Sequence, residues 1–185
     1  MRTLTSLGLA VLRLLDAQPQ HPYELRQQMR EQGLDRIVKV THGALYHTVE
    51  TLAKAELIKP TETTREGKRP ERTVYAITGT GREVARDRLR ELLVTVTPEY
   101  PPYRTALAFM GMLPQKDAVD LLDRRAIALD GELAALQTGH DAAIKQGLPA
   151  IALVELQHMQ AHVRADVELT KALADDIREG RLTWQ

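Results

Sequence analysis

Four cationic side chains fall within eight consecutive residues, and this density suits contact with a polyanion. Residues 65–72 read Arg-Glu-Gly-Lys-Arg-Pro-Glu-Arg. A cation that neutralises a phosphate releases condensed counterions, so the affinity of such a surface falls steeply with added salt. At least two of the four are expected to contact nucleic-acid phosphates or to reach a minor groove, although a solvated charged surface is the plain alternative. These cations are Arg65, Lys68, Arg69 and Arg72.

A second polar set belongs to a helix predicted over residues 42–55. Leu45, Val49 and Leu52 repeat at helical spacing and form its inward face. Thr41 precedes the first turn and is the expected N-cap, because its hydroxyl can accept a hydrogen bond from a free backbone N–H. The remaining face of this helix is therefore free to contact a partner.

The first turns of this helix carry the side chains best suited to read a nucleic acid. Gly43 and Ala44 are small, which lets the backbone approach a partner closely. His42 and His47 fall on the outer side, where they either reach base edges in a major groove or are simply solvated. We expect Thr41 and all four of these residues at the interface.

Two tyrosines and a lysine complete the predicted interface. Tyr46 and Tyr23 can each donate a phenolic hydrogen bond to a phosphate, or each can serve as an aromatic wedge in the core. Lys39 lies just before the helix and is a candidate for phosphate contact, whereas Lys54, far along the helix, is more typical of a solvated charge.

Residues that could support catalysis or metal binding are scarce. His158 and His162 have the i, i+4 spacing of a metal clamp, but no third ligand is evident, and interface or surface histidines are the commoner case. Gly79-Thr80-Gly81 lacks the third glycine of a dinucleotide loop. No paired carboxylates, Ser-His-Asp set or cysteine is present. We therefore expect no catalytic residues, no metal and no cofactor, and hence no enzyme.

The elements that position these side chains follow from periodicity and turn signals. Pro60 marks the first strand as an edge strand, and Ala85, Leu89, Leu92 and Val96 should face inward on the last helix. The order helix, helix, helix, hairpin, helix is that of a winged helix-turn-helix. The expected helices are 4–17, 22–32, 42–55 and 79–96, with strands at 57–64 and 73–77.

The second half is predicted to be a helical dimerisation domain. Tyr100-Pro101-Pro102-Tyr103 punctuates the chain, and we divide it into a DNA-binding domain at 1–97 and a dimerisation and effector-sensing domain at 98–185. A long helix after Pro114 has apolar residues at alternating spacings of three and four, which is a heptad seam. The expected dimerisation residues are Val119, Leu122, Ala126, Leu129, Leu133, Leu136, Met159 and Val163.

An apolar cluster at the start of the second half is a weaker candidate for an effector pocket. Tyr103, Phe109, Met110 and Met112 gather near the domain junction, where ligand sites are common and where methionine adapts its shape. Ordinary core packing is the more frequent role of such residues. Trp184, at the far end, either caps a partner's domain or is disordered.

Composition limits the function classes. The chain has 185 residues, 43% of them hydrophobic, which is enough for a buried core. Its formal net charge is zero, but residues 1–92 carry 16 basic and 12 acidic side chains, and residues 93–185 carry 9 and 13. No apolar run is long enough to span a membrane, and the start lacks the pattern of a signal peptide. A cytoplasmic protein is expected.

Four segments of the first half carry a family resemblance: His21–Leu25, Thr41–Tyr46, Leu52–Ile58 and Lys68–Glu83. In this order they resemble the PadR family of bacterial transcriptional regulators, and the resemblance covers residues 4–90. It implies a homodimeric repressor that binds a near-palindromic DNA operator, dimerises through its C-terminal helices, and leaves DNA when a small, often aromatic or hydrophobic, molecule or a cellular signal arrives. Where the family usually has Thr-Leu-Tyr-Pro, this chain has Ala44-Leu45-Tyr46-His47, a difference that bears on the operator sequence.

Three alternatives stay open from the sequence. The same fold can act as a protein–protein interaction module without DNA binding, although such a module needs no cations at the wing tip. A related winged-helix family dimerises through an N-terminal helix. A small helical enzyme is the third, and the absence of an acid–base constellation counts against it.

Overall fold

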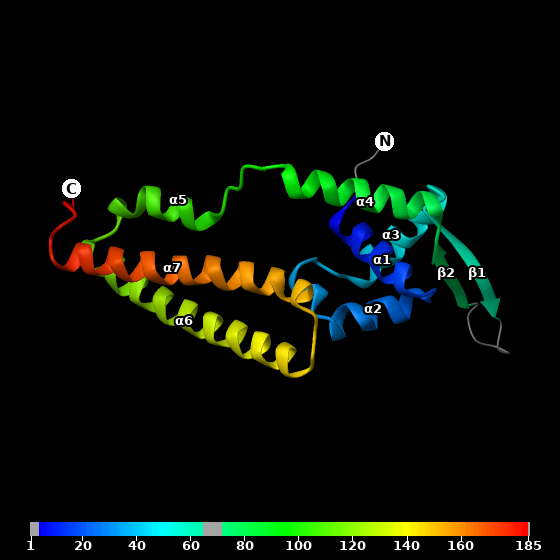
Figure 1. The fold of residues 1–185 in the computed structure, drawn as a ribbon. Coiled ribbons are helices and arrows are strands. Elements are labelled where there is room, and N and C mark those ends of the chain that lie inside the picture. Colours follow the sequence, from blue (N-terminus) through cyan, green and yellow to red (C-terminus); the bar gives the residue numbers. More distant parts are fainter. Residues whose placement is uncertain (1–3, 65–71, 185) are drawn as a thin grey trace. The chain divides into compact units, whose positions relative to one another are not determined.

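A computed structural model describes residues 4–64 and 72–184 of the chain. The chain divides into two compact units, Met1–Thr97 and Pro98–Gln185, which are described separately below (Figure 1). Both are built mainly of helices, and the one sheet among the described residues has two strands. The fold class expected from the sequence, mainly α with a small β wing and a helical second half, is confirmed. No helix in the described ranges is long and apolar enough to cross a membrane.

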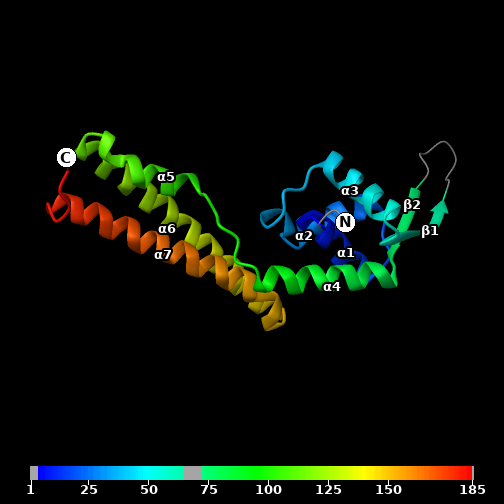
Figure 2. The ribbon, with the colours of Figure 1, turned by 90° about the horizontal axis from the view of Figure 1, so that it is seen from above.

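The first unit has the element order of a winged helix-turn-helix. Figure 2 shows α4 returning beside α1 after the β1–β2 hairpin. The helices differ from the sequence prediction mainly in their bounds. α4 stops at Val94 instead of residue 96, and a short 3-10 turn, η1, precedes α3. The elements are α1 (Ser6–Ala17), α2 (Pro22–Glu31), η1 (Leu34–Arg36), α3 (His42–Lys54), β1 (Ile58–Thr64), β2 (Arg72–Ile77) and α4 (Gly79–Val94).

The wing is an antiparallel hairpin anchored to the helical core. Ile58 pairs with Ile77 at its base, and a bulge between Pro60 and Glu62 interrupts the register. Gln20 forms a bridge with Tyr75, so β2 has neighbours on both sides and β1 is the edge strand. The hairpin and the edge position of Pro60 are thus as predicted, since proline cannot donate to a second ladder.

The core of the first unit joins one face of each helix to the base of the hairpin. Leu12, Leu25 and Leu45 come from α1, α2 and α3 and are fully buried, together with Ile58 of β1. Gln20 is buried among them and donates its side-chain N–H to the Leu14 carbonyl at 3.3 Å. Burial of these apolar faces fixes which sides of α2 and α3 face solvent.

The predicted inward face of α4 is only partly correct. Ala85 is half-buried, but Leu89 and Leu92 are exposed and Val96 is 94% exposed. Leu89 and Leu92 line an open groove beside α1 rather than a closed core, and Val96 lies beyond the end of the helix. The spacing of apolar residues on α4 could not show how much of this face α1 covers.

The second unit is an antiparallel helical hairpin with a short helix before it. α6 and α7 pack along their lengths, as Figure 1 shows. Gly147 has a φ of 74°, a conformation that suits glycine at the end of a helix. The elements are α5 (Pro102–Phe109), η2 (Met110–Met112), α6 (Gln115–Lys145), η3 (Ala150–Leu153) and α7 (Val154–Arg178).

The heptad seam of α6 finds its partner within the same chain. Leu122 packs in a cluster with Ala174 and Ile177 of α7, so the seam is covered there without a second subunit. The physical reason is that a heptad pattern encodes an apolar stripe but not the chain that covers it. Dimerisation remains a prediction, and it concerns the less buried members of the set. Buried are Leu122, Ala126, Leu129 and Leu136, and half-buried are Val119, Leu133, Met159 and Val163.

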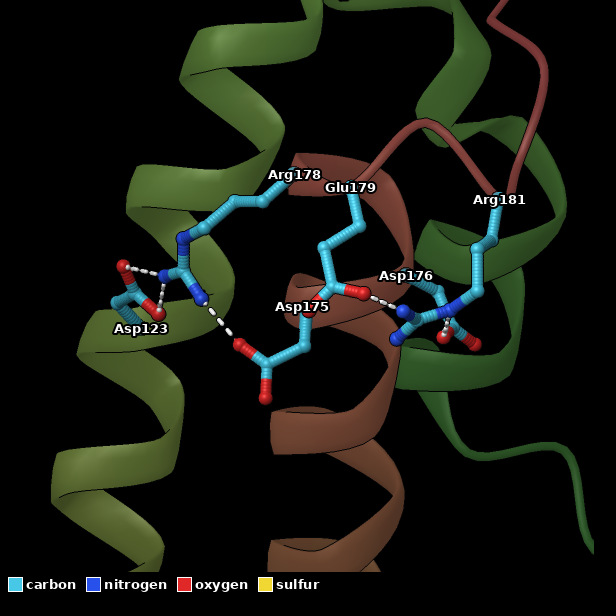
Figure 3. A network of polar contacts seen from close by, with 6 residues as sticks. All are labelled: Asp123, Asp175, Asp176, Arg178, Glu179 and Arg181. Atoms are coloured by element: carbon cyan, nitrogen blue, oxygen red, sulfur yellow. Dashed lines mark hydrogen bonds and ion pairs between the residues drawn. The ribbon is translucent and has the colours of Figure 1, made fainter.

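Ion pairs join the two helices at the end of α7 (Figure 3). Arg178 donates to both carboxylate oxygens of Asp123 on α6 and, at 2.5 Å, to Asp175 on its own helix. The hydrogen bond to Asp123 raises the pKa of Arg178, and the charges of Asp123 and Asp175 act in the same direction. Because these groups are exposed, solvent screens the pairs, and they chiefly set the register of the two helices. A neighbouring pair joins Arg181 to Asp176 at 2.6 Å.

The C-terminal tryptophan is docked on its own unit. Trp184 is half-buried, packs against the cluster around Leu122, and donates its indole N–H to the Leu113 carbonyl at 2.9 Å. The expectation of disorder at this residue was therefore wrong, because a specific hydrogen bond and an apolar contact hold the ring.

Gly81 should be the glycine that the first unit cannot replace. A Cβ at this position would lie 2.1 Å from the Leu57 carbonyl oxygen, whereas a Cβ at Gly79 meets nothing within 4 Å. We expect Gly81→Ala to lower the free energy of unfolding by about 1–3 kcal/mol or more. Gly79→Ala, in the same helical turn, should be neutral or stabilising by up to about 1 kcal/mol. Urea denaturation of both variants measures the difference, and equal midpoints would contradict the close approach.

Candidate nucleic-acid interface

The local sequence of α3 places one face in the core and the other in solvent. Leu45, Val49 and Leu52 are buried, as their spacing predicted. The Thr41 hydroxyl accepts a hydrogen bond from the Ala44 N–H at 3.2 Å, so this residue caps the helix. The cap fixes the first turn, and the three buried residues fix the rotation of the helix about its axis.

The exposed face of α3 presents the predicted side chains together. His42, Gly43, Ala44 and His47 are all exposed. Gly43 has no neighbouring atom within 4 Å of where a Cβ would lie, so the packing of this chain does not require glycine there. The absence of that Cβ leaves room for a molecule outside the protein.

Tyr46 has an intermediate environment. The residue is half-buried, and its ring lies 4.5 Å from the His42 ring, tilted by 44°. The side chain is thus neither enclosed in the core nor fully solvated. Both roles considered from the sequence remain compatible with this position.

The start of α2 lies next to this turn. Tyr23 is 61% exposed, which is incompatible with a wedge in the core. Arg26 follows it on the same face of α2, and its Nη1 lies 3.5 Å from Nδ1 of His42. Sequence reasoning missed Arg26, although its i, i+3 spacing from Tyr23 was the available signal. A guanidinium beside the exposed turn adds positive charge where phosphates would lie.

The structure describes only some of the other residues that were predicted to contact a nucleic acid. Lys39 is exposed two residues before Thr41. Arg65, Lys68 and Arg69 lie outside the described residues, as does the side chain of Arg72, whose backbone begins β2. Lys59, on β1, is a further exposed cation of the wing that the sequence pattern did not single out.

The four residues of the expected effector pocket have different surroundings. The guanidinium carbon of Arg125 lies over the Tyr103 ring, 3.5 Å from the ring centroid. The Tyr103 hydroxyl is 3.3 Å from the Thr170 hydroxyl. Met110 packs against the cluster around Leu122. Phe109 and Met112 are 62% and 85% exposed. An effector pocket lined by these four residues stays a prediction.

An apolar groove lies elsewhere, between α1, η1 and α4 of the first unit. Its volume is about 460 Å³, and Leu9, Val38, Ala85 and Leu89 are among its lining residues. Three arginines and one aspartate also line it, and Arg82 donates to Asp16 at 2.7 Å. The groove is therefore apolar with an excess of positive charge. Its charged lining residues are Arg13, Asp16, Arg82 and Arg86.

Metal binding by a preformed cluster finds no support in the described ranges. There, no group of three or more His, Cys, Asp or Glu side chains is placed to hold an ion.

Comparisons with known proteins agree with this geometry. A family model described as "Transcriptional regulator PadR-like family" matches residues 11–87. The chain resembles Bacillus subtilis PadR solved with operator DNA, with a TM-score of 0.77 at 18% identity, over 94% of this chain and 99% of that one. It also resembles PadR from the same organism solved with p-coumaric acid, with a TM-score of 0.75 at 17% identity, over 93% and 98%.

A third solved structure is the PadR-like transcriptional regulator BC1756 from Bacillus cereus. The TM-score is 0.66 at 17% identity, over 95% of this chain and 99% of that one. No curated protein sequence matches the chain. At these identities the structural matches establish the fold, and the family model establishes the resemblance of the segment it covers.

The cap at Thr41 allows its structural role to be separated from a contact role. Thr41→Ala removes the acceptor for the Ala44 N–H and should lower the free energy of unfolding by about 1 kcal/mol. Thr41→Ser keeps the acceptor and should leave stability within about 0.5 kcal/mol of the parent. Urea denaturation followed by circular dichroism measures both. Equal destabilisation by the two variants would mean that the methyl group, and not the cap, matters.

Proposed function

We propose, from the match of residues 11–87 to the model of the PadR-like family of transcriptional regulators, that the chain is a homodimeric repressor that binds a near-palindromic DNA operator. In this proposal α3 is the recognition helix and enters the major groove. A small molecule releases the protein from DNA. Double-stranded DNA, a second copy of the chain and this effector are its partners.

The observation that carries the proposal is the exposed face of α3 with its cationic neighbours. Small residues at positions 43 and 44 permit close approach, and the imidazole of His47 can donate to or accept from a base edge. Tyr23, Arg26 and Lys39 flank this face and can hold phosphates, which fixes the position of the helix without reading sequence. A protein-binding module would need no such combination.

Dimerisation in this proposal uses the apolar side chains that the second unit leaves exposed. The buried residues of the α6 seam are already covered by α7, so a second copy would contact the half-buried members of the predicted set and the exposed apolar residues near them. Two copies of α3 must then lie about 34 Å apart to enter successive major grooves. The exposed large apolar residues of α6 and α7 are Leu121, Ile127, Ile144, Val154 and Leu169.

The groove of the first unit is the proposed effector site. Its apolar lining suits an aromatic ring, and Arg13 and Arg86 suit an anionic substituent. One wall includes η1 and Val38, and the chain runs from there directly into the cap of α3. A ligand that displaces η1 would therefore shift the recognition helix. A coupling of about 1–3 kcal/mol between the two sites is sufficient for release.

The DNA-binding part is tested by selecting bound duplexes from random sequence and then titrating the best one at several salt concentrations. Lys39→Ala should weaken binding to all sequences and reduce the slope of log K against log salt by about 1. His47→Ala should instead change the discrimination at one base pair, an effect of about 1–3 kcal/mol. Lys116→Ala, on α6, is the matched charge control and should leave both quantities unchanged. Binding without any salt dependence would exclude the proposed interface.

The effector part is tested with p-coumaric acid and its uncharged methyl ester as probes. If the arginines recognise an anion, the acid should weaken operator binding at lower concentration than the ester does. Ala85→Trp fills the groove and should abolish the response to either probe, while Ala152→Trp, in η3 of the second unit, should preserve it. A response that survives Ala85→Trp places the effector outside the groove without bearing on DNA binding.

A further inference from the structure

Two histidines on α7 have a geometry that the proposed function does not use. His158 and His162 lie one helical turn apart and are both exposed. Their Nε2 atoms are 3.2 Å apart, and their ring centroids are 4.4 Å apart with a tilt of 48°. Both rings thus direct the same nitrogen toward one point beside the helix.

The separation of these nitrogens matches two ligands of one metal ion. Nitrogens bound to zinc at about 2.0–2.1 Å, with an angle of about 90–109° between them, lie about 2.9–3.4 Å apart. The observed 3.2 Å falls within this range. No rearrangement of the helix is needed to bring the two imidazoles to a shared ion.

Mutual hydrogen bonding is the other arrangement that the distance permits. One neutral imidazole can donate to the other. Such a bond between exposed groups exchanges two bonds to water for one within the protein and adds little stability. A divalent ion replaces this weak interaction with two coordinate bonds, and neutral imidazole is the form that it binds.

We propose that His158 and His162 form a bidentate site for a divalent transition-metal ion of the zinc class. Imidazole nitrogen suits Zn²⁺, Ni²⁺ and Cu²⁺ rather than Mg²⁺ or Ca²⁺. Asp166, one turn further along, lies 3.5 Å from Arg125 on α6 and is therefore engaged by that guanidinium. Within the described ranges no third His, Cys, Asp or Glu side chain joins the pair, so water or a second molecule completes the coordination.

The surroundings of the pair favour a second copy of the chain as that second molecule. Val154 and Leu169 lie on the same side of α7 as the histidines and are exposed. These apolar side chains would be buried if two α7 helices met, and the two histidine pairs would then supply four nitrogens, the number that tetrahedral zinc prefers. The site itself requires only one chain, and it does not depend on DNA binding.

The test is titration of the untagged, full-length protein with ZnCl₂ in competition with a chromophoric chelator. The wild type should bind one ion per chain, or one per two chains if the ion is shared, and either stoichiometry supports the site. His158→Ala and His162→Ala should each lower the zinc affinity about 10-fold or more, because a lost ligand matters at least as much as a lost second-shell partner. His140→Ala, on α6, is the matched control and should bind as the wild type does.

A second measurement identifies the atoms involved. In long-range ¹H–¹⁵N spectra, zinc should shift the Nε2 resonances of both His158 and His162 and leave those of His42 and His47 in place. Sedimentation with and without zinc distinguishes one ion per chain from an ion shared by two. Zinc binding that is equal in the wild type and the His158→Ala/His162→Ala double variant would overturn the proposal, and so would the absence of any binding by the wild type.

Discussion

The burial of one face of α3 is the constraint on which the candidate interface depends. Leu45, Val49 and Leu52 must lie in the core, and this requirement fixes the rotation of the helix to within a fraction of a turn. The cap at Thr41 fixes where the helix begins. Every exposed residue of the first turns therefore has its direction set by residues that contact no partner, so the chemistry of the outer face can change without loss of the fold.

Several local patterns in the sequence were sufficient, although the spacing on α4 was not, because Leu89 and Leu92 are exposed. The three buried residues of α3, the edge position of Pro60 and the cap at Thr41 were all predicted from spacing and residue type. The close approach at Gly81 was not, because it depends on the Leu57 carbonyl from a different element. Arg26 was missed for a similar reason, since its place beside His42 depends on how α2 crosses α3.

Apolar patterns along the second unit predicted which residues are buried, but they did not predict which helix covers them. The seam through Leu122 and Leu129 predicted an interface, and the interface that exists in this unit is with α7 of the same chain. The effector pocket expected from Tyr103, Phe109 and Met112 stays a prediction, because the exposure of Phe109 and Met112 does not show what would cover them. Long-range packing decides these cases, and a single sequence carries little information on it.

The distribution of charge explains why a polyanion should meet only the first unit. Residues 93–185 carry 13 acidic and 9 basic side chains. Of those cations, Arg125, Lys171, Arg178 and Arg181 are paired with carboxylates of the same unit. The field that remains is negative and repels phosphates, whereas residues 1–92 carry 16 basic and 12 acidic side chains and attract them. Ion pairs within the second half leave this asymmetry unchanged, because each pair joins charges of opposite sign and the net charge of that half stays negative. In the proposed complex a DNA duplex would therefore be attracted to the first unit.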